Sequence, residues 1–249
     1  MPVSQDHPQV SIVIPLYNEA GYLGTNVTLI ENYLRTVQLD YEVVLVNDGS
    51  SDATKAFCDA IVNRSPPVRL ISYPVNRGKG YAVKTGVLDA LGEYIIFTDA
   101  DLAVPVQFIG TCLKKLEAGA PIVIGSRHLR KSSFKVREDP LRQFLGEVFR
   151  RFAQLSLGLK VSDITCGLKG FEKKAAFEIF SRSKIDRWGY DAEIIFLAQK
   201  LGYRIGEIPV DWYHSFDSKV KVGSASIKTL TEMLQIHYYY RTNCYYLSD

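Results

Sequence analysis

Short apolar runs alternate with amphipathic stretches through the first half of the chain. Runs that are short, β-branched and bounded by turn residues predict buried strands at Val10–Pro15, Glu42–Val46, Val68–Ser72, Tyr94–Thr98 and Pro121–Gly125. Helical spacing between them predicts helices near residues 22–36, 52–63, 79–91 and 105–118, with Asp52 as an N-cap and Pro105 in a first turn. The alternation predicts an α/β fold whose mainly parallel sheet carries helices on both faces.

Polar segments follow the first four predicted strands, at residues 15–19, 47–52, 76–80 and 99–101. Ligands of open α/β sheets bind beyond the carboxyl ends of the strands, where these segments would meet. Turn chemistry explains each segment singly, but their convergence predicts a binding site. Gly78 and Gly80 lack the spacing of a Walker loop, and no G-x-G-x-x-G follows the first strand, which argues against a dinucleotide cofactor.

Asp99-Ala100-Asp101 closes the fourth apolar run. In an extended strand, side chains alternate between faces, so both carboxylates would emerge on the same side. Without a cation they would repel each other, and hard oxygen ligands suit Mg²⁺ or Mn²⁺, whose open positions accept phosphate oxygens. Asp-x-Asp strings also occur in solvated turns, so the metal-site interpretation depends on the neighbouring segments.

Composition narrows the class of protein. The chain has 249 residues, of which 47% are hydrophobic, enough for one substantial core. A net charge of +3 indicates no nucleic-acid partner, and four cysteines without a CxxC pair suit a reducing compartment. The polar residues 1–9 predict a loose tail. The longest uncharged run, residues 102–113, falls short of the roughly 18 residues of a membrane span.

An ordered set of motifs resembles the family 2 glycosyltransferases, which have the glycosyltransferase-A fold. Within them the chain resembles the polyprenyl-phosphate sugar synthases, the dolichyl-phosphate mannose and glucose synthases and their bacterial relatives. The resemblance covers roughly residues 10–235. The motifs are VSIVIPLYNE (10–19), VNDGSSD (46–52), NRGKG (76–80), DADL (99–102), GSR (125–127), DITCGLKG (163–170), WGYDAE (188–193), GEIPV (206–210) and SK (218–219).

The resemblance implies roles for individual residues. The base and ribose of a nucleotide-sugar would be held by Pro15, Tyr17, Glu19, Val46 and Asp48. The diphosphate would be held by Asp99, Ala100 and Asp101, directly and through the metal, and Lys79 would also bind the donor. Arg127 and Lys219 match positions that contact phosphate, while Trp188 and Asp191 would lie near the sugar. Two departures are Tyr213, followed by His214, where some relatives carry Arg, and Ala103, where some carry a polar residue.

A lipid-phosphate acceptor would need no strong general base, because a phosphate monoester with a second pKa of about 6 is already anionic at neutral pH. Positioning it requires cations, and a basic stretch follows the fifth predicted strand, with Arg142 assigned to the acceptor. Its members are Arg127, Arg130, Lys131, Lys135, Arg137, Arg142, Arg150 and Arg151. The chemistry predicts in-line displacement with inversion and a β-linked product. A solvated surface is the alternative for this stretch.

Two apolar stripes at helical spacing lie in the second half. One, beside the basic stretch, predicts an interfacial helix on an anionic membrane or a helix packed on the sheet. It comprises Leu141, Phe144, Leu145, Val148, Phe149, Phe152, Leu155 and Leu159. The other, ahead of a tyrosine-rich end, favours a core or subunit contact over a membrane interface. It comprises Ile227, Leu230, Leu234 and Tyr238.

The leading hypothesis is therefore a metal-dependent transferase from a nucleotide-sugar to polyprenyl phosphate. WGYDAE resembles the glucose branch, so UDP-glucose is the favoured donor and GDP-mannose the second. The predicted units are a tail (1–9), a donor-binding half (10–125), an acceptor-facing half (126–223) and a C-terminal helix (224–249). We expect a peripheral enzyme on the cytoplasmic face of a membrane, with room for a membrane-protein partner or a homo-oligomer.

Two alternatives stay open from the residues alone. A family 2 transferase acting on a saccharide hydroxyl would need a general base, supplied by an acid in the region 186–193. Within that region, Asp191 and Glu193 stand where a helix start is expected, and acids there are often only dipole and cap partners. A non-catalytic nucleotide-binding subunit is the other, and the intact Asp99 and Asp101 argue against it.

Overall fold

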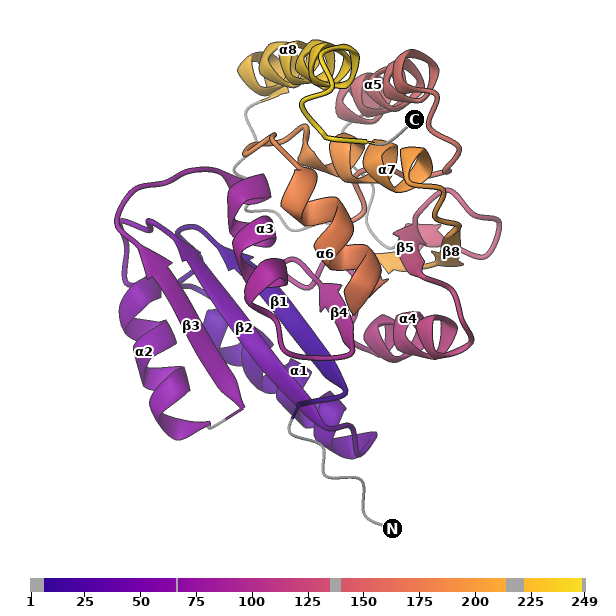
Figure 1. Ribbon diagram of the computed structural model, residues 1–249. Coiled ribbons are helices and arrows are strands. Elements are labelled where there is room, and N and C mark those ends of the chain that lie inside the picture. The colour runs from indigo at the N-terminus through magenta and orange to yellow at the C-terminus, as the bar shows by residue number, and fades with distance from the viewer. Residues whose placement is uncertain (1–6, 66, 135–139, 214–221, 248–249) are drawn as a thin grey trace.

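The computed structural model describes residues 7–65, 67–134, 140–213 and 222–247. Its main sheet has seven strands in the order β3-β2-β1-β4-β7-β5-β8 (Figure 1). In chain order these are β1 (Val10–Leu16), β2 (Tyr41–Asp48), β3 (Val68–Tyr73), β4 (Tyr94–Phe97), β5 (Ile122–Ser126), β7 (Lys169–Glu172) and β8 (Ile205–Pro209). A small parallel pair joins β6 (Ser133–Phe134) to β9 (Asp211–Trp212).

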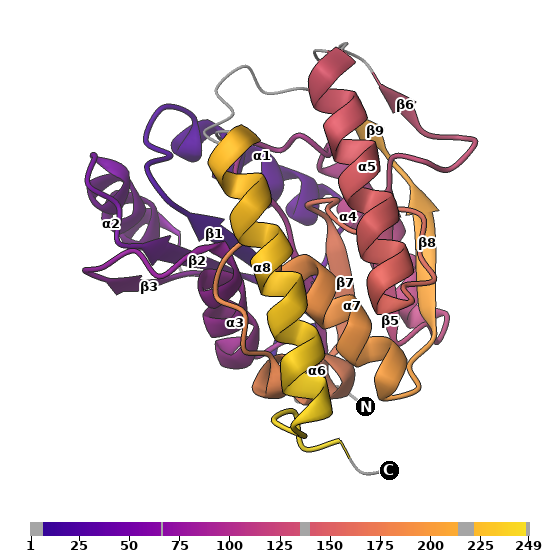
Figure 2. The same cartoon turned by 90° about the horizontal axis from the view of Figure 1, so that it is seen from above.

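Helices cover both faces of the sheet and bury an apolar cluster on each. One face packs α1 (Leu23–Thr36), α2 (Thr54–Arg64) and α4 (Gln107–Glu117). The other packs α3 (Lys79–Asp89), α6 (Lys173–Arg182) and α7 (Tyr190–Lys200). Outside α7, the helices α5 (Pro140–Leu157) and α8 (Val222–Arg241) lie side by side (Figure 2). The predicted mainly parallel, helix-flanked sheet is confirmed.

The first five strands lie within two residues of their predicted bounds, because each is a short, largely apolar run bounded by turn residues. The edge strand β3 is only partly buried. Strand β7 was not predicted. It enters between β4 and β5 and is antiparallel to both, with Lys169 opposite Phe97 and Ile124. Because its direction is reversed, β7 begins at the edge where β4 and β5 end. A residue at the start of β7 therefore lies beside the segments that follow those two strands.

Some local expectations need correction. Helix α2 begins at Thr54, so Asp52 lies ahead of the cap position; its carboxylate still accepts the N–H of Thr54 at 2.9 Å. Among the described side chains of α8, Leu234 and Tyr238 are exposed, whereas Met233 and Ile236 are buried. The core interpretation of that stripe is therefore wrong for Leu234 and Tyr238.

The stripe at α5 is described only in part. Phe152 and Leu155 are exposed, Leu155 to 85%, whereas Leu159, beyond the helix, is buried. The side chains of the other stripe residues lie outside those that the structure describes: Leu141, Phe144, Leu145, Val148 and Phe149. No helix in the described ranges combines the length and the apolar character needed to cross a bilayer.

Candidate active site

The segments after β1, β2 and β3 are tied together by hydrogen bonds. Asp48, buried at the end of β2, accepts the N–H of Arg77 at 2.8 Å, the N–H of Gly78 at 2.9 Å and the side-chain amide of Asn76 at 2.7 Å. Asn18 has a positive φ of 58° and accepts the N–H of Ser51 at 2.8 Å. Three of the four predicted polar segments thus form one connected edge.

Asp99 and Asp101 lie beyond the end of β4 in a turn, not in an extended strand as predicted. The N–H of Leu102 donates to the carbonyl of Asp99 at 3.2 Å, and Leu102 has a positive φ of 50°. Side chains with a Cβ rarely adopt this backbone conformation, and such strain concentrates at functional sites. The turn, rather than strand alternation, brings the two carboxylates together.

The two carboxylates crowd each other. Burial and the charge of Asp99 raise the pKa of Asp101, despite the N–H of Ala103, which donates to Asp101 Oδ1 at 3.1 Å. Burial would also raise the pKa of Asp99, but the Lys79 ammonium, 2.5 Å from Asp99 Oδ1, lowers it overall. Glu19 adds a further negative charge near Asp101. The site concentrates carboxylates where a cation would relieve their repulsion.

The residues present fit a divalent cation. Asp99 Oδ1 is buried and accepts no well-directed hydrogen bond from the residues that the structure describes; the Lys79 contact is an ion pair. Within the described ranges, no group of three or more His, Cys, Asp or Glu side chains forms a complete metal cage. Mg²⁺ and Mn²⁺ suit such a site, because substrate phosphates and water complete a shell begun by one or two carboxylates.

Gly167 makes room for the Asp99 carboxylate. A Cβ at this position would lie 2.7 Å from Asp99 Cγ, closer than real Cβ contacts allow. We expect Gly167→Ala to leave the fold intact, because a partly exposed side chain can move, and to lower the transfer rate about a hundredfold, as misplacement of a reacting group does. Steady-state rates measure the effect, with Gly24→Ala as control, since apart from its own helix no described residue would come within 4 Å of that Cβ. An unchanged rate would show that the position of Asp99 does not matter.

Lys79, the first residue of α3, links the carboxylate pair to the region predicted to hold the sugar. Burial would lower its pKa, but the charges of Asp99 and Asp191 outweigh this and raise it. Its ammonium also lies 6.0 Å from the centre of the Trp188 ring, which is half exposed. The structure therefore brings together five predicted residues: Lys79, Asp99, Asp101, Trp188 and Asp191.

Lys169 is a site residue that the sequence analysis missed. Its side chain is fully buried, its ammonium pairs with Asp191, and it donates to the carbonyl of Cys166 at 2.7 Å. Burial raises the pKa of Asp191 despite this pairing. A lone charged residue in the apolar segment LKGF was the available signal, but only the antiparallel pairing of β7 places it beside Phe97.

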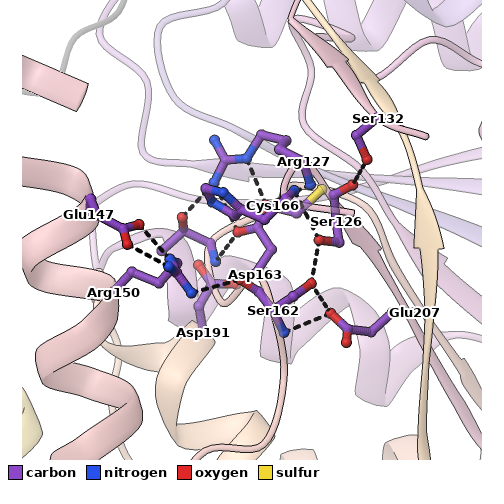
Figure 3. A network of polar contacts seen from close by, with 12 residues as sticks. Ser126, Arg127, Ser132, Glu147, Arg150, Ser162, Asp163, Cys166, Asp191 and Glu207 are labelled. Carbon is purple, nitrogen blue, oxygen red and sulfur yellow. Dashed lines mark hydrogen bonds and ion pairs between the residues drawn. The ribbon is translucent and has the colours of Figure 1, made fainter. Parts of the chain in front are cut away.

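Arg127, at the end of β5, makes a two-pronged ion pair with the buried Asp163 (Figure 3). Its Nε lies 2.8 Å from Asp163 Oδ2 and its Nη2 3.0 Å from Oδ1, and its N–H also donates to Oδ2 at 3.0 Å. The guanidinium lies 5.7 Å from the centre of the Trp212 ring. Its charge also lowers the pKa of Asp99, after the larger effects of Lys79 and Lys169.

The Arg127–Asp163 pair predicts a pH dependence of stability. Burial would raise the pKa of Asp163, but Arg127 lowers it to about 2. A carboxyl whose pKa falls on folding stabilises the fold above its unfolded pKa of about 4, and this contribution is lost as the pH falls toward 2. We expect Asp163→Asn to remove about 2 kcal/mol of unfolding free energy at pH 7 and less than about 1 kcal/mol at pH 2.5. Urea titrations across this range measure it; a pH-independent difference would contradict the assignment.

A polar network connects this pair to α5 (Figure 3). Arg150 pairs with Glu147 at 2.6 Å and donates to the carbonyl of Ser162 at 3.2 Å. The Ser162 hydroxyl lies 2.5 Å from that of Ser126, and its N–H donates to Glu207 at 2.8 Å. Arg150, which the sequence analysis grouped with acceptor-binding cations, therefore fixes α5 to the segment carrying Asp163.

Other predicted site residues have mixed placements. Tyr17 is exposed at the end of β1, and Ala100 is buried, its carbonyl accepting the side-chain amide of Asn26 at 2.7 Å. Val46 is fully buried in β2 between β1 and β3, so its side chain is not available to a nucleotide. Asp48 is buried and Pro15 is partly buried. Their binding of the base and ribose stays a prediction. The side chains of Lys219 and Arg142 lie outside the described residues.

Both departures from the family pattern lie next to the carboxylate turn. The N–H of Tyr213 donates to the carbonyl of Ala103 at 2.9 Å, and Ala103 in turn donates to Asp101. Tyr213 is exposed, so an aromatic ring lies where some relatives have a cation. The main chain after β9 thus supports the turn that carries Asp101.

The fold is shared with solved enzymes. Glucosyl-3-phosphoglycerate synthase of Mycobacterium tuberculosis, solved with Mn²⁺, UDP and glucosyl-3-phosphoglycerate, superposes with a TM-score of 0.69 over 92% of this chain and 80% of its own, at 18% identity. The same enzyme was also solved with Mg²⁺ and UDP, at a TM-score of 0.68. The fold and the carboxylate edge define a glycosyltransferase of the glycosyltransferase-A fold.

Sequence likeness narrows the class. The family model for glycosyl transferase family 2 matches residues 11–180, and the chain belongs to that family. A dolichyl-phosphate beta-glucosyltransferase of Trichomonas vaginalis is 33% identical over 96% of this chain and 76% of its own. The dolichyl-phosphate beta-glucosyltransferase of Mus musculus is 33% identical over 100% of this chain and 82% of its own.

Proposed function

We propose that the protein transfers glucose from UDP-glucose to dolichyl phosphate or a related polyprenyl phosphate, with inversion, giving a β-linked lipid-phosphate glucose. The observation that carries this proposal is the likeness, over nearly the whole chain, to several dolichyl-phosphate beta-glucosyltransferases. GDP-mannose is the alternative donor, ranked after UDP-glucose. Mg²⁺ or Mn²⁺ held by Asp99 and Asp101 would neutralise the charge that grows on the leaving diphosphate.

The state of the neighbouring acids favours an acceptor that is already ionised. Asp191 is paired with the buried Lys169. Glu193 is buried and accepts the N–H groups of Lys184 at 2.8 Å and Ile185 at 3.0 Å and the hydroxyl of Tyr245 at 2.8 Å. These contacts argue against either carboxylate as the general base for an acceptor hydroxyl, and leave Asp191 to accept hydrogen bonds from the hydroxyls of the donor sugar. A lipid phosphate attacks with its own anionic oxygen and makes this step unnecessary.

The remaining residues bind and orient. Tyr17 and Glu19, at the end of β1, would face the nucleoside, with Asp48 fixing the adjacent 76–78 segment. Trp188 offers a half-exposed ring to the sugar, and Asp191 a carboxylate for its hydroxyls. Arg127 and Lys219 would position phosphate groups, and Arg142 the acceptor. In-line attack on the anomeric carbon then inverts its configuration.

A polyprenyl acceptor requires contact with a membrane. The exposed Phe152 and Leu155 on α5 suit a peripheral enzyme, and the cytoplasmic face is the side proposed. A membrane-protein partner and a homo-oligomer are both compatible with this arrangement.

The test of this function is a matrix of donors and acceptors. UDP-glucose and GDP-mannose are each incubated with dolichyl phosphate, undecaprenyl phosphate and a free saccharide in the presence of Mn²⁺, and products are identified by mass. We expect a hexose on the lipid phosphate, from UDP-glucose in preference. Glycosylation of the saccharide with no lipid product would select the alternative family 2 activity.

A further inference from the structure

Two lysines of the site pair with aspartates, but only one pair is sealed from solvent. The side chain of Lys169 is 0% exposed and that of its partner Asp191 9%. The side chains of Lys79 and Asp99 are 22% and 32% exposed. Separating a buried pair leaves uncompensated charges, whereas water screens and replaces the partner in a solvated one. Asp99 Oδ1 is itself buried, but the Lys79–Asp99 pair as a whole is the more exposed of the two and is therefore the one able to exchange partners.

Asp99 Oδ1 is the atom for which the Lys79 ammonium and a divalent cation would compete. Lys79 Nζ lies 2.5 Å from it, and no described residue donates a well-directed hydrogen bond to it. A divalent cation on this carboxylate pair draws on the same negative charge, and an ammonium and a doubly charged cation repel each other at such distances. The two cations therefore compete for Asp99.

We propose that Lys79 is a built-in counter-ion that occupies Asp99 in the donor-free enzyme and leaves it when the divalent cation and the nucleotide-sugar bind. This inference rests on the proposed metal role of Asp99 and Asp101. It adds that the protein carries its own substitute for the cation, so that donor and cation bind cooperatively.

The surroundings of Lys79 offer its displaced ammonium another carboxylate and hold its backbone in place. Asp191, which is not among the proposed metal ligands, attracts it, and the Trp188 ring lies 6.0 Å away. The backbone is held on both sides: Gly78 has a φ of 117°, and Cβ atoms at Gly78 and Gly80 would meet the carbonyls of Asp186 and Ile185 at 2.5 and 2.6 Å. Only the Lys79 side chain needs to move. The negative charge of a bound diphosphate would draw it off Asp99.

Binding of Mn²⁺ without nucleotide tests the competition. We expect Lys79→Gln to tighten Mn²⁺ binding about tenfold, measured from the free-ion electron paramagnetic resonance signal, because the competing charge is gone. Lys79→Arg keeps a cation and should resemble the wild type. Lys84→Gln, on the same helix, removes an equal charge that contacts the carbonyl of Ser183 and should also leave Mn²⁺ affinity unchanged. With UDP present, we expect Lys79→Gln to weaken Mn²⁺–UDP binding.

Pulsed acetylation of the native enzyme measures how accessible the Lys79 amine is, and so whether it has left Asp99. Mn²⁺ alone should increase labelling of Lys79, and Mn²⁺ with UDP should suppress it again, while labelling of Lys84 stays constant. Equal or weaker Mn²⁺ binding by Lys79→Gln, or Lys79 labelling indifferent to Mn²⁺, overturns the competition and leaves the proposed function standing. A wild type that binds no Mn²⁺ even with UDP would instead refute the metal role itself.

Discussion

We expect Asp101→Asn to lower the rate of sugar transfer about a thousandfold while the protein stays folded. The substitution keeps the shape of the side chain and its acceptor for the N–H of Ala103, but removes half of the charge that would hold the cation. Burial and Asp99 already raise the pKa of Asp101, so losing this charge relieves repulsion in the donor-free protein. The loss should therefore appear in catalysis and not in stability.

The measurement is kcat at saturating donor across a Mn²⁺ titration, beside the unfolding free energy. Asp59→Asn is the matched control, since this exposed carboxylate pairs only with Lys55 in α2 among the contacts described. A variant that keeps more than about a tenth of the wild-type rate would mean that Asp101 does not carry the cation.

The largest expected effect on stability comes from Lys169→Met. Removing the ammonium leaves the buried Asp191 without its partner, which costs about 3–5 kcal/mol of unfolding free energy. Replacing both members, as Lys169→Met with Asp191→Leu, should recover most of that loss, because an apolar pair needs no charge compensation. Chemical denaturation of the three proteins measures the effect.

Binding of UDP-glucose relative to UDP shows whether the Lys169–Asp191 pair acts only in stability or also in sugar binding. If Asp191 binds the sugar as proposed, the double variant should fold and bind UDP normally but lose affinity for UDP-glucose relative to UDP. A double variant with wild-type preference for UDP-glucose would confine the pair to stability.

Much of the donor-binding half could be predicted because its signals are local. The apolar runs of β1 to β5 carry their own turn residues, and parallel pairing brings their polar ends to one edge. Asp99 and Asp101 follow β4 at this edge, and Lys79 reaches them because α3, which it starts, packs across β1, β2 and β4. The turn at Leu102 was not predicted, because nothing in DADL indicates a positive φ at a leucine.

What sequence reasoning missed depends on contacts between distant segments. Strand β7 is four residues long, and its place between β4 and β5 is set by tertiary pairing. Lys169 acquires its partner Asp191 only through that pairing, and Asp163 meets Arg127 across 36 residues of chain. On α8, the stripe through Leu234 and Tyr238 matched a core-facing period, yet Met233 and Ile236 pack inward instead.

Transfer from UDP-glucose to dolichyl phosphate in EDTA, followed by return of Mn²⁺ in steps, most directly tests the account. We predict that lipid-phosphate glucose stops forming in EDTA and returns with Mn²⁺ in the wild type, but not in Asp101→Asn. Undiminished transfer in EDTA would contradict it.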